Sequence, residues 1–168
     1  MEIPTDPHDI SQRAAITVDS ICKTYPSATG TVTALDNVSC AIERGQFVSI
    51  VGPSGCGKST LLHIIAGLTA PTSGRVVVAG TAVDGPQTHM GVVFQNPVLL
   101  EWRDAIGNIL LQAEARSMDR ASAMVTAQQL LASMGLEGFE HKRPSELSGG
   151  MQQRVAICRS LLHDPSIV

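Results

Sequence analysis

One short stretch of the chain has the residue types and spacing that phosphate binding requires. Its glycines let the backbone bend tightly, so that successive N–H groups point inward as an anion-binding nest. Lys58 supplies a point charge for the β- and γ-phosphates of a nucleotide, and the Ser59 hydroxyl is placed to ligate Mg²⁺. The stretch matches the P-loop pattern G-x-x-x-x-G-K-[ST] and consists of Gly52, Pro53, Ser54, Gly55, Cys56, Gly57, Lys58, Ser59 and Thr60.

The flanking residues fit the elements that a P-loop requires. Residues 47–51 are β-branched and mostly apolar, which predicts a strand buried on both faces. The positive end of a following helix would add to the field of the loop. The alternative, a chance match on a glycine-rich turn, does not explain this context. The predicted apolar face of the helix consists of Leu61, Ile64, Ile65 and Leu68.

Composition limits the class of protein. The chain has 168 residues, a single-domain length that buries about 70% of the unfolded surface. The net charge of −3 and the lack of a long basic run argue against a nucleic-acid partner. The four cysteines are scattered, as is typical of reduced thiols and not of a disulfide framework or metal site. We expect a disordered lead-in over residues 1–13, no signal peptide, and a soluble chain without a membrane span.

The first half of the chain reads as β-rich. Turn-type residues at 26–30 and 36–37 separate short segments of β-branched residues, which predicts antiparallel strands joined by hairpins. Residues 165–168 look like the opening of a further strand. The predicted strands outside the P-loop cover residues 15–18, 32–35, 38–42, 75–79 and 89–94.

Helical spacing takes over in the second half. We expect a helical insertion over about residues 98–143, with Asp104 as an N-cap and Gly135 as a helix end. A third helix follows residues 147–154. The predicted apolar faces are Ile106, Ile109, Leu110 and Ala113; Ala127, Leu130, Leu131 and Met134; and Met151, Val155, Cys158 and Leu162.

Residues 147–154, Leu-Ser-Gly-Gly-Met-Gln-Gln-Arg, are the second informative motif. Together with the P-loop they make the chain resemble the ATP-binding cassette (ABC) ATPases, the motor subunits of ABC transporters, because the stretch matches the signature sequence of that family. The resemblance covers residues 14–168. It implies an α/β fold: a P-loop NTPase (RecA-like) core with an antiparallel β subdomain and a helical insertion, truncated before the Walker B strand.

The resemblance implies ATP and Mg²⁺ as cofactors, bound by residues 52–60. Tyr25 sits where the family stacks an aromatic ring on adenine, although a half-buried tyrosine at a strand end is the alternative. Gln95 sits at the family's Q-loop, where it would complete the Mg²⁺ shell and orient the attacking water; a polar residue ending a strand is the alternative. Cys56 occupies a variable position, where alkylation would block the site.

The signature residues would close on the γ-phosphate held by a second subunit. The alternative is a purely structural role, in which Ser148 is the N-cap of a helix. This structural role does not exclude the contact with a second subunit. The family's pairing is head to tail, so the implied partner is a second ABC ATPase subunit. The residues assigned to this contact are Ser148, Gly149, Gly150 and Gln152.

The remaining implied partners are transmembrane permease subunits and a solute-binding protein, with the chain on the cytoplasmic face of the membrane and no nucleic acid bound. Trp102 is either exposed at the groove that grips a membrane subunit or an ordinary core residue. The surrounding stretch resembles the nitrate, sulfonate and taurine importer branch, in which proline is common at the position of Glu101.

The sequence departs from the family after Val168, since the Walker B Asp-Glu pair and the switch histidine are not among its residues. Losing a general base costs about 10² to 10⁴ in rate, so we expect the chain alone to hydrolyse ATP poorly. We also expect exposed apolar edges beside the P-loop strand. The alternatives are a non-hydrolysing ATP-binding module, an ABC ATPase of repair or translation, and a P-loop kinase, which has no reason to carry residues 147–154.

Overall fold

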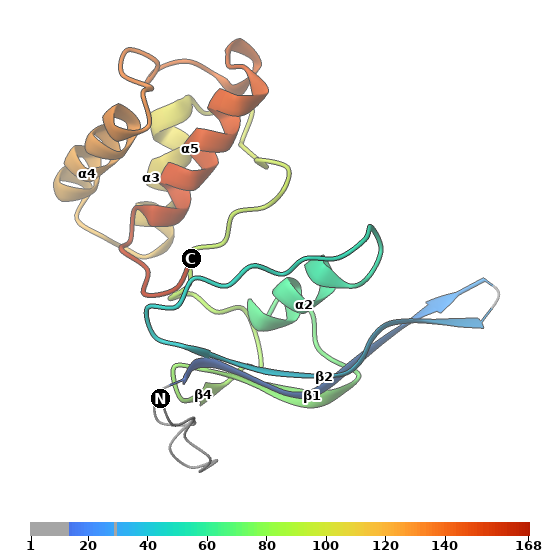
Figure 1. Ribbon diagram of the computed structural model, residues 1–168. Coiled ribbons are helices and arrows are strands. Elements are labelled where there is room, and N and C mark those ends of the chain that lie inside the picture. Colours follow the sequence, from blue (N-terminus) through green and yellow to red (C-terminus); the bar gives the residue numbers. More distant parts are fainter. Residues whose placement is uncertain (1–13, 29) are drawn as a thin grey trace. The chain divides into compact units, whose positions relative to one another are not determined.

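The computed structural model describes residues 14–28 and 30–168, and the lead-in predicted for residues 1–13 lies outside them. The chain divides into two compact units, Met1–Gln87 and Thr88–Val168. Figure 1 shows the β-rich first unit in blue to green and the helical second unit in yellow to red. Taken together, the strands of the first unit and the helices of the second give the α/β class that the P-loop and residues 147–154 predict.

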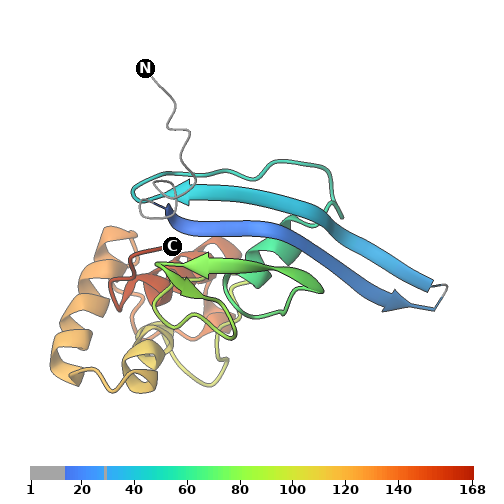
Figure 2. The same cartoon turned by 90° about the horizontal axis from the view of Figure 1, so that it is seen from below.

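The first unit is built on an antiparallel sheet with the strand order β2-β1-β3-β4 (Figure 2). Strands β1 (Ala14–Ser27) and β2 (Gly30–Glu43) form a long hairpin, which confirms the turn predicted at 26–30. Strand β3 (Ser73–Val78) pairs with the other side of β1, close to the predicted strand. The two-residue strand β4 (Thr81–Ala82) pairs with β3 and was not predicted.

The turn predicted at residues 36–37 is wrong, because β2 runs through these positions. Asn37 adopts a φ of 49° and Ser20 a φ of 52°, and the pairing register shifts between Val18 and Lys23. These are the signs of a β-bulge, which inserts extra residues into a ladder without ending it. Asparagine tolerates positive φ better than most residues, so the turn-type residue marks an irregularity within a strand.

Helix α2 (Lys58–Ile65) packs on this sheet and contacts β1, β2 and β3 (Figure 1). The prediction that Leu68 shares its buried face is wrong. The helix ends three residues earlier, and Gly67, with a φ of 72°, turns the chain so that Leu68 is exposed. The buried apolar residues of this unit include Ile16, Val18, Ile21, Leu35, Leu61, Ile64, Ile65, Val76 and Val78.

Residues 47–51 do not form the predicted buried strand. They pair with no strand in the described part of the chain, and the side chains of Phe47 and Val51 are 95% and 89% exposed. A strand of a parallel sheet owes its hydrogen bonds and its burial to neighbours on both sides. Without such neighbours among the described residues the segment stays unpaired, and the exposed apolar surface expected beside the P-loop is present.

The strand predicted at 89–94 is also wrong except at Met90, for the same physical reason. Met90 forms a parallel bridge with Ile167, and the Gly91 N–H donates to the Ile167 carbonyl at 2.8 Å. This bridge is a single ladder contact. It agrees with the strand opening predicted at residues 165–168.

The second unit consists of helices α3 (Ala105–Ala115), α4 (Arg120–Ser133) and α5 (Gly149–Leu161), with a short 3-10 turn, η1 (Pro144–Glu146), before α5. The three helices pack against one another (Figure 1). Their predicted apolar faces are confirmed, since every member is buried in, or packed against, one cluster. None of the helices in residues 14–28 and 30–168 has both the length and the apolarity needed to cross a bilayer.

A buried amide fixes the approach to α3. Asn108 is fully buried, and its Oδ1 accepts from the Leu100 N–H at 2.7 Å. Its Nδ2 donates to the carbonyls of Leu100, Arg103 and Asp104 at 3.0 to 3.1 Å. Because every one of these bonds ends on the segment before α3, the segment is held to the helix that follows it.

Candidate nucleotide-binding site

The P-loop curls around the ammonium group of its own lysine. Lys58 Nζ donates to the carbonyls of Gly52 at 2.8 Å and Pro53 at 2.7 Å, and lies 3.5 Å from the Cys56 sulfur. These contacts place a positive charge in the bend of the loop, where a phosphate would be held.

Glycine is required at the point where the loop enters α2. Gly57 has a φ of 91°, a conformation that side-chain-bearing residues rarely adopt. A Cβ there would lie 2.3 Å from the Ala34 carbonyl oxygen of β2. The loop backbone is therefore pressed against the sheet, which fixes the position of the start of α2.

The N-terminus of α2 differs from that of every other α-helix in the described residues. Its N-cap, Gly57, makes no side-chain hydrogen bond. In α3, α4 and α5, by contrast, the side chains of Asp104, Asp119 and Ser148 accept from a backbone N–H of the first turn. The first N–H groups of a helix have no partner within the helix, so those of α2 remain available to an anion.

The rest of the predicted P-loop residues surround this helix start. Ser59 and Thr60 lie in the first turn of α2, with Ser59 exposed. Pro53, Ser54 and Gly55 are exposed, and so is the Cys56 thiol. The side chains of Ser54 and Ser59 are therefore exposed on either side of Lys58 along the chain.

Tyr25 lies near the outer end of the β1–β2 hairpin, where it pairs with Val32. Its side chain is 38% exposed. Lys23 Nζ lies 5.0 Å from the centroid of the ring and donates to the Ala70 carbonyl at 2.7 Å. Tyr25 is therefore not a core residue, and the Lys23 ammonium covers one face of its ring at a distance typical of cation–π contacts.

A second set of predicted residues lies in the helical unit. Gln95 is exposed, in the segment that follows Phe94. Ser148 caps α5, its Oγ accepting from the Met151 N–H at 3.3 Å, and Gly149 and Gly150 are exposed in the first turn. Gln152 is turned inward, donating from Nε2 to the carbonyls of Pro144 at 2.8 Å and Leu147 at 3.2 Å. Its amide nitrogen is thus occupied by the backbone before α5.

The two sets belong to different units. Tyr25 and the P-loop lie in Met1–Gln87, whereas Gln95 and the residues at the start of α5 lie in Thr88–Val168. Within each unit the structure brings the predicted residues into a defined local arrangement.

Sequence reasoning missed two side chains of α5 that hold the segment containing Gln95. Gln153 Nε2 donates to the Phe94 carbonyl at 3.1 Å. Arg159 donates to the carbonyls of Pro97 and Val98, each at 2.9 Å. The sequence does not signal these contacts, because all three acceptors are backbone groups some 60 residues away along the chain.

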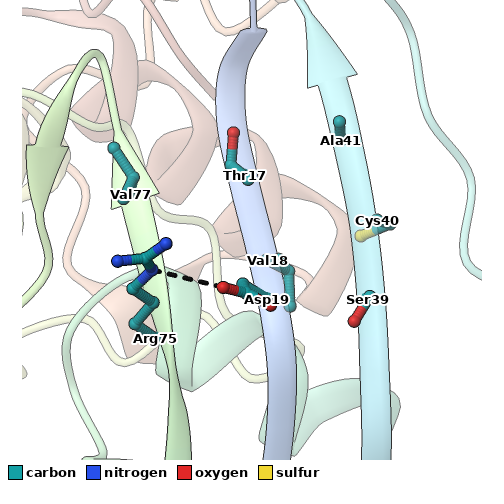
Figure 3. Close-up of a pocket in the computed structure, with 8 residues that line it drawn as sticks. All are labelled: Thr17, Val18, Asp19, Ser39, Cys40, Ala41, Arg75 and Val77. Carbon is teal, nitrogen blue, oxygen red and sulfur yellow. Dashed lines mark ion pairs between the residues drawn. The ribbon is translucent and has the colours of Figure 1, made fainter. Parts of the chain in front are cut away.

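A hollow on the sheet contains none of the predicted site residues (Figure 3). Arg75 of β3 and Asp19 of β1 form an ion pair across it, with Nε and Oδ2 3.2 Å apart. Thr17, Asp19, Arg75 and Val77 alternate with buried residues along their strands, so they point to the face opposite the core. Since its charges are already paired, this hollow offers a nucleotide less than the P-loop does.

Comparisons with a family model, with curated proteins and with solved structures all point to the same family. The family model described as "ABC transporter" matches residues 35–168. The chain is 42% identical over 93% of its length to an uncharacterized ABC transporter ATP-binding protein of Methanocaldococcus jannaschii. It is 38% identical over 96% of its length to the bicarbonate transport ATP-binding protein CmpD of Synechocystis, and 46% identical over 80% of its length to the taurine import ATP-binding protein TauB of Yersinia pestis.

The chain spans only 53% to 58% of the length of these relatives. Among solved structures, it is similar to an ATP-binding cassette captured as a dimer in a post-hydrolysis state bound to ADP and Pi. That similarity has a TM-score of 0.83 and 36% identity, and covers 89% of this chain and 70% of the other. The fold resemblance therefore extends over most of the chain.

Proposed function

The chain belongs to the ABC transporter family, and from this premise we propose that it forms the ATP-binding part of a subunit that couples ATP binding and hydrolysis to solute import. The names of the curated relatives support import, since they include taurine and bicarbonate systems. Family membership already implies nucleotide binding. We propose below which residues bind the phosphates, the base, the Mg²⁺ ion and the second subunit.

The observation that carries the proposal is the uncapped start of α2 beside the Lys58 ammonium. Three other helices satisfy their first turn with a side chain, and this one does not. Free N–H groups, the positive end of the helix dipole and a lysine together form a site for several negative charges. A nucleotide triphosphate matches that requirement.

We assign binding roles to the residues of the first unit as follows. On binding, the Lys58 ammonium exchanges loop carbonyls for β- and γ-phosphate oxygens, and the amides of residues 55–59 bind the phosphate chain. Tyr25 offers the face of its ring not covered by Lys23 to the adenine base, a stacking contact of about 1 kcal/mol. The Ser59 hydroxyl and the Gln95 amide oxygen are hard ligands of the kind that Mg²⁺ accepts, and the metal would neutralise developing charge on the phosphates.

The exposed start of α5 is assigned to a second subunit. Ser148, Gly149 and Gly150 present a helix N-terminus to solvent, which suits the γ-phosphate held by a partner's P-loop in a head-to-tail dimer. A dimeric relative among the solved structures supports this arrangement. Permease subunits and a solute-binding protein complete the proposed importer, with the ATPase at the cytoplasmic face of the membrane.

Equilibrium titration with a fluorescent ATP analogue tests the proposal. We expect Lys58→Met to weaken binding roughly 10- to 100-fold, because charge-assisted hydrogen bonds to the phosphates are lost. Arg44→Met is the control, since it removes an exposed positive charge outside the P-loop. We expect turnover below a tenth of that of a full-length cassette, as no Walker B pair occurs among the 168 residues. Equal affinity of the parent chain and Lys58→Met would refute the phosphate site, and turnover comparable to that of a full cassette would refute the expected inactivity.

A further inference from the structure

The segment from Phe94 to Val98, here called the Gln95 loop, is bound at both ends by side chains of α5. Gln153 Nε2 reaches the Phe94 carbonyl at one end. Arg159 reaches the Pro97 and Val98 carbonyls at the other. Gln95 itself lies between these two attachment points and is exposed.

The backbone of this loop is strained at its second attachment point. Val98 adopts a φ of 46°, and for a β-branched residue this left-handed conformation is unfavourable. Asn96 precedes Pro97, which restricts it to extended conformations. A loop with such local preferences keeps its shape only if other contacts hold it.

Arg159 is suited to hold it. Its planar guanidinium donates two hydrogen bonds from one rigid fork, and both go to adjacent carbonyls of the loop at 2.9 Å. Burial lowers the pKa of this guanidinium, and no carboxylate forms a salt bridge with it among the described residues. Burying half of a cation whose charge is balanced only by backbone dipoles costs desolvation free energy. This cost indicates that Arg159 does more than fill space in the helical unit.

We propose that Arg159 is a positioning residue that clamps the strained Val98 backbone and thereby fixes Gln95 for its role in Mg²⁺-nucleotide binding. Gln153 secures the other end of the same loop. Because both anchors project from α5, the helix that begins at Ser148, the geometry ties the Gln95 loop to the signature helix as one body. The link to nucleotide rests on the proposed function; the clamp itself does not.

Backbone ¹⁵N relaxation of the Gln95 loop tests the clamp without nucleotide. In Arg159→Met we expect the order parameters of Gln95, Val98 and Leu99 to fall from the rigid range, about 0.85, to below about 0.6, since the two hydrogen bonds that hold the loop backbone are lost. Arg159→Lys keeps the charge but not the fork, so it should give intermediate values. Val98→Asn relieves the strain, because asparagine tolerates positive φ, so adding it to Arg159→Met should restore part of the order.

The matched control is Arg154→Met on the same helix. Arg154 also donates to a backbone carbonyl, that of Met134 at 2.8 Å, but not to the Gln95 loop. It should leave the order parameters of the Gln95 loop unchanged. Unchanged order parameters in Arg159→Met, or an equal fall in Arg154→Met, would overturn the clamp. If Arg159→Met does not fold, the comparison of Arg159→Lys with and without Val98→Asn decides the same question.

Nucleotide affinity with and without Mg²⁺ tests the link to Gln95. We expect Gln95→Ala to reduce the Mg²⁺-dependent gain in ATP affinity about 10-fold, and Arg159→Met to do the same while metal-free affinity is unchanged. The double variant should lose no more than either single one. If Gln95→Ala has no effect, the proposed role of Gln95 fails and the clamp rests on the order parameters alone. If only Gln95→Ala has an effect, the positioning role of Arg159 is refuted.

Discussion

Cys56 is the residue whose chemistry most directly reports on the P-loop. Its thiol is exposed and lies 3.5 Å from Lys58 Nζ, and a Cβ on Gly52 would lie 2.8 Å from its sulfur. An adduct on this sulfur would therefore lie beside the Lys58 ammonium, in the bend of the P-loop. Occupation by nucleotide and alkylation should exclude each other.

We expect N-ethylmaleimide to modify Cys56 at pH 7 and MgATP to slow that modification, as followed by peptide mass spectrometry. Burial raises the pKa of Cys158 to about 11 and raises the pKa of Cys40. Since the thiolate is the nucleophile, less of it is present at pH 7 and both should react slowly, gaining reactivity as the pH rises toward the pKa. Cys40 is the control for protection, because it is exposed on β2 away from the P-loop. Equal slowing of Cys40 and Cys56 by MgATP would contradict the assignment.

Local signals determined the helices well. The predicted apolar faces of α3, α4 and α5 depend on contacts among these three helices, all of which are present in the chain. The caps at Asp104 and Ser148 follow from side-chain chemistry within a single turn. Such elements are predictable because their stabilising partners are close in sequence or in the same bundle.

The strands at 47–51 and 89–94 were mispredicted for the opposite reason. Their apolar, β-branched residues do favour extended backbone, but a strand also needs a partner, and only Met90 finds one in the described residues. The contacts of Gln153 and Arg159 with backbone carbonyls were equally invisible, since any residue at positions 94, 97 and 98 presents a carbonyl. Strand pairing and hydrogen bonds to backbone carbonyls depend on the tertiary structure, and the residue types of a short segment do not reveal them.

A cap substitution tests the account of α3. Asp104 Oδ1 accepts from the Gly107 N–H at 2.8 Å, so Asp104→Ala should lower the free energy of unfolding by about 1 kcal/mol. Asp104→Asn keeps an oxygen acceptor and should cost only a few tenths of that amount. Urea denaturation followed by circular dichroism gives both values. Equal losses in the two variants would show that the cap is not what the carboxylate contributes.

At the scale of the whole molecule, the exposed apolar segment before the P-loop is the main liability. Phe47 and Val51 are almost fully exposed, and unpaired apolar segments of this kind promote association. The same segment leads directly into Gly52, so its association would also hinder access to the nucleotide site. Solubility and binding are therefore coupled through these few residues.

We expect the purified chain to self-associate at micromolar concentration and Phe47→Ser to reduce that association, as measured by sedimentation velocity. Phe139→Ser is the control for the same substitution elsewhere, because Phe139 lies in the helical unit and is 38% exposed. Substitution there should have little effect. An equal reduction in both variants would mean that association does not depend on the segment at 47–51.

The central claim is that the backbone of the P-loop binds a phosphate chain. Amide chemical shifts of the ¹⁵N-labelled chain, recorded during titration with MgATP and separately with adenosine, test it most directly. We predict that the signals of Gly55, Gly57, Lys58 and Ser59 move with MgATP and stay in place with adenosine. If MgATP binds while these four signals remain fixed, or if adenosine moves them equally, the claim is wrong.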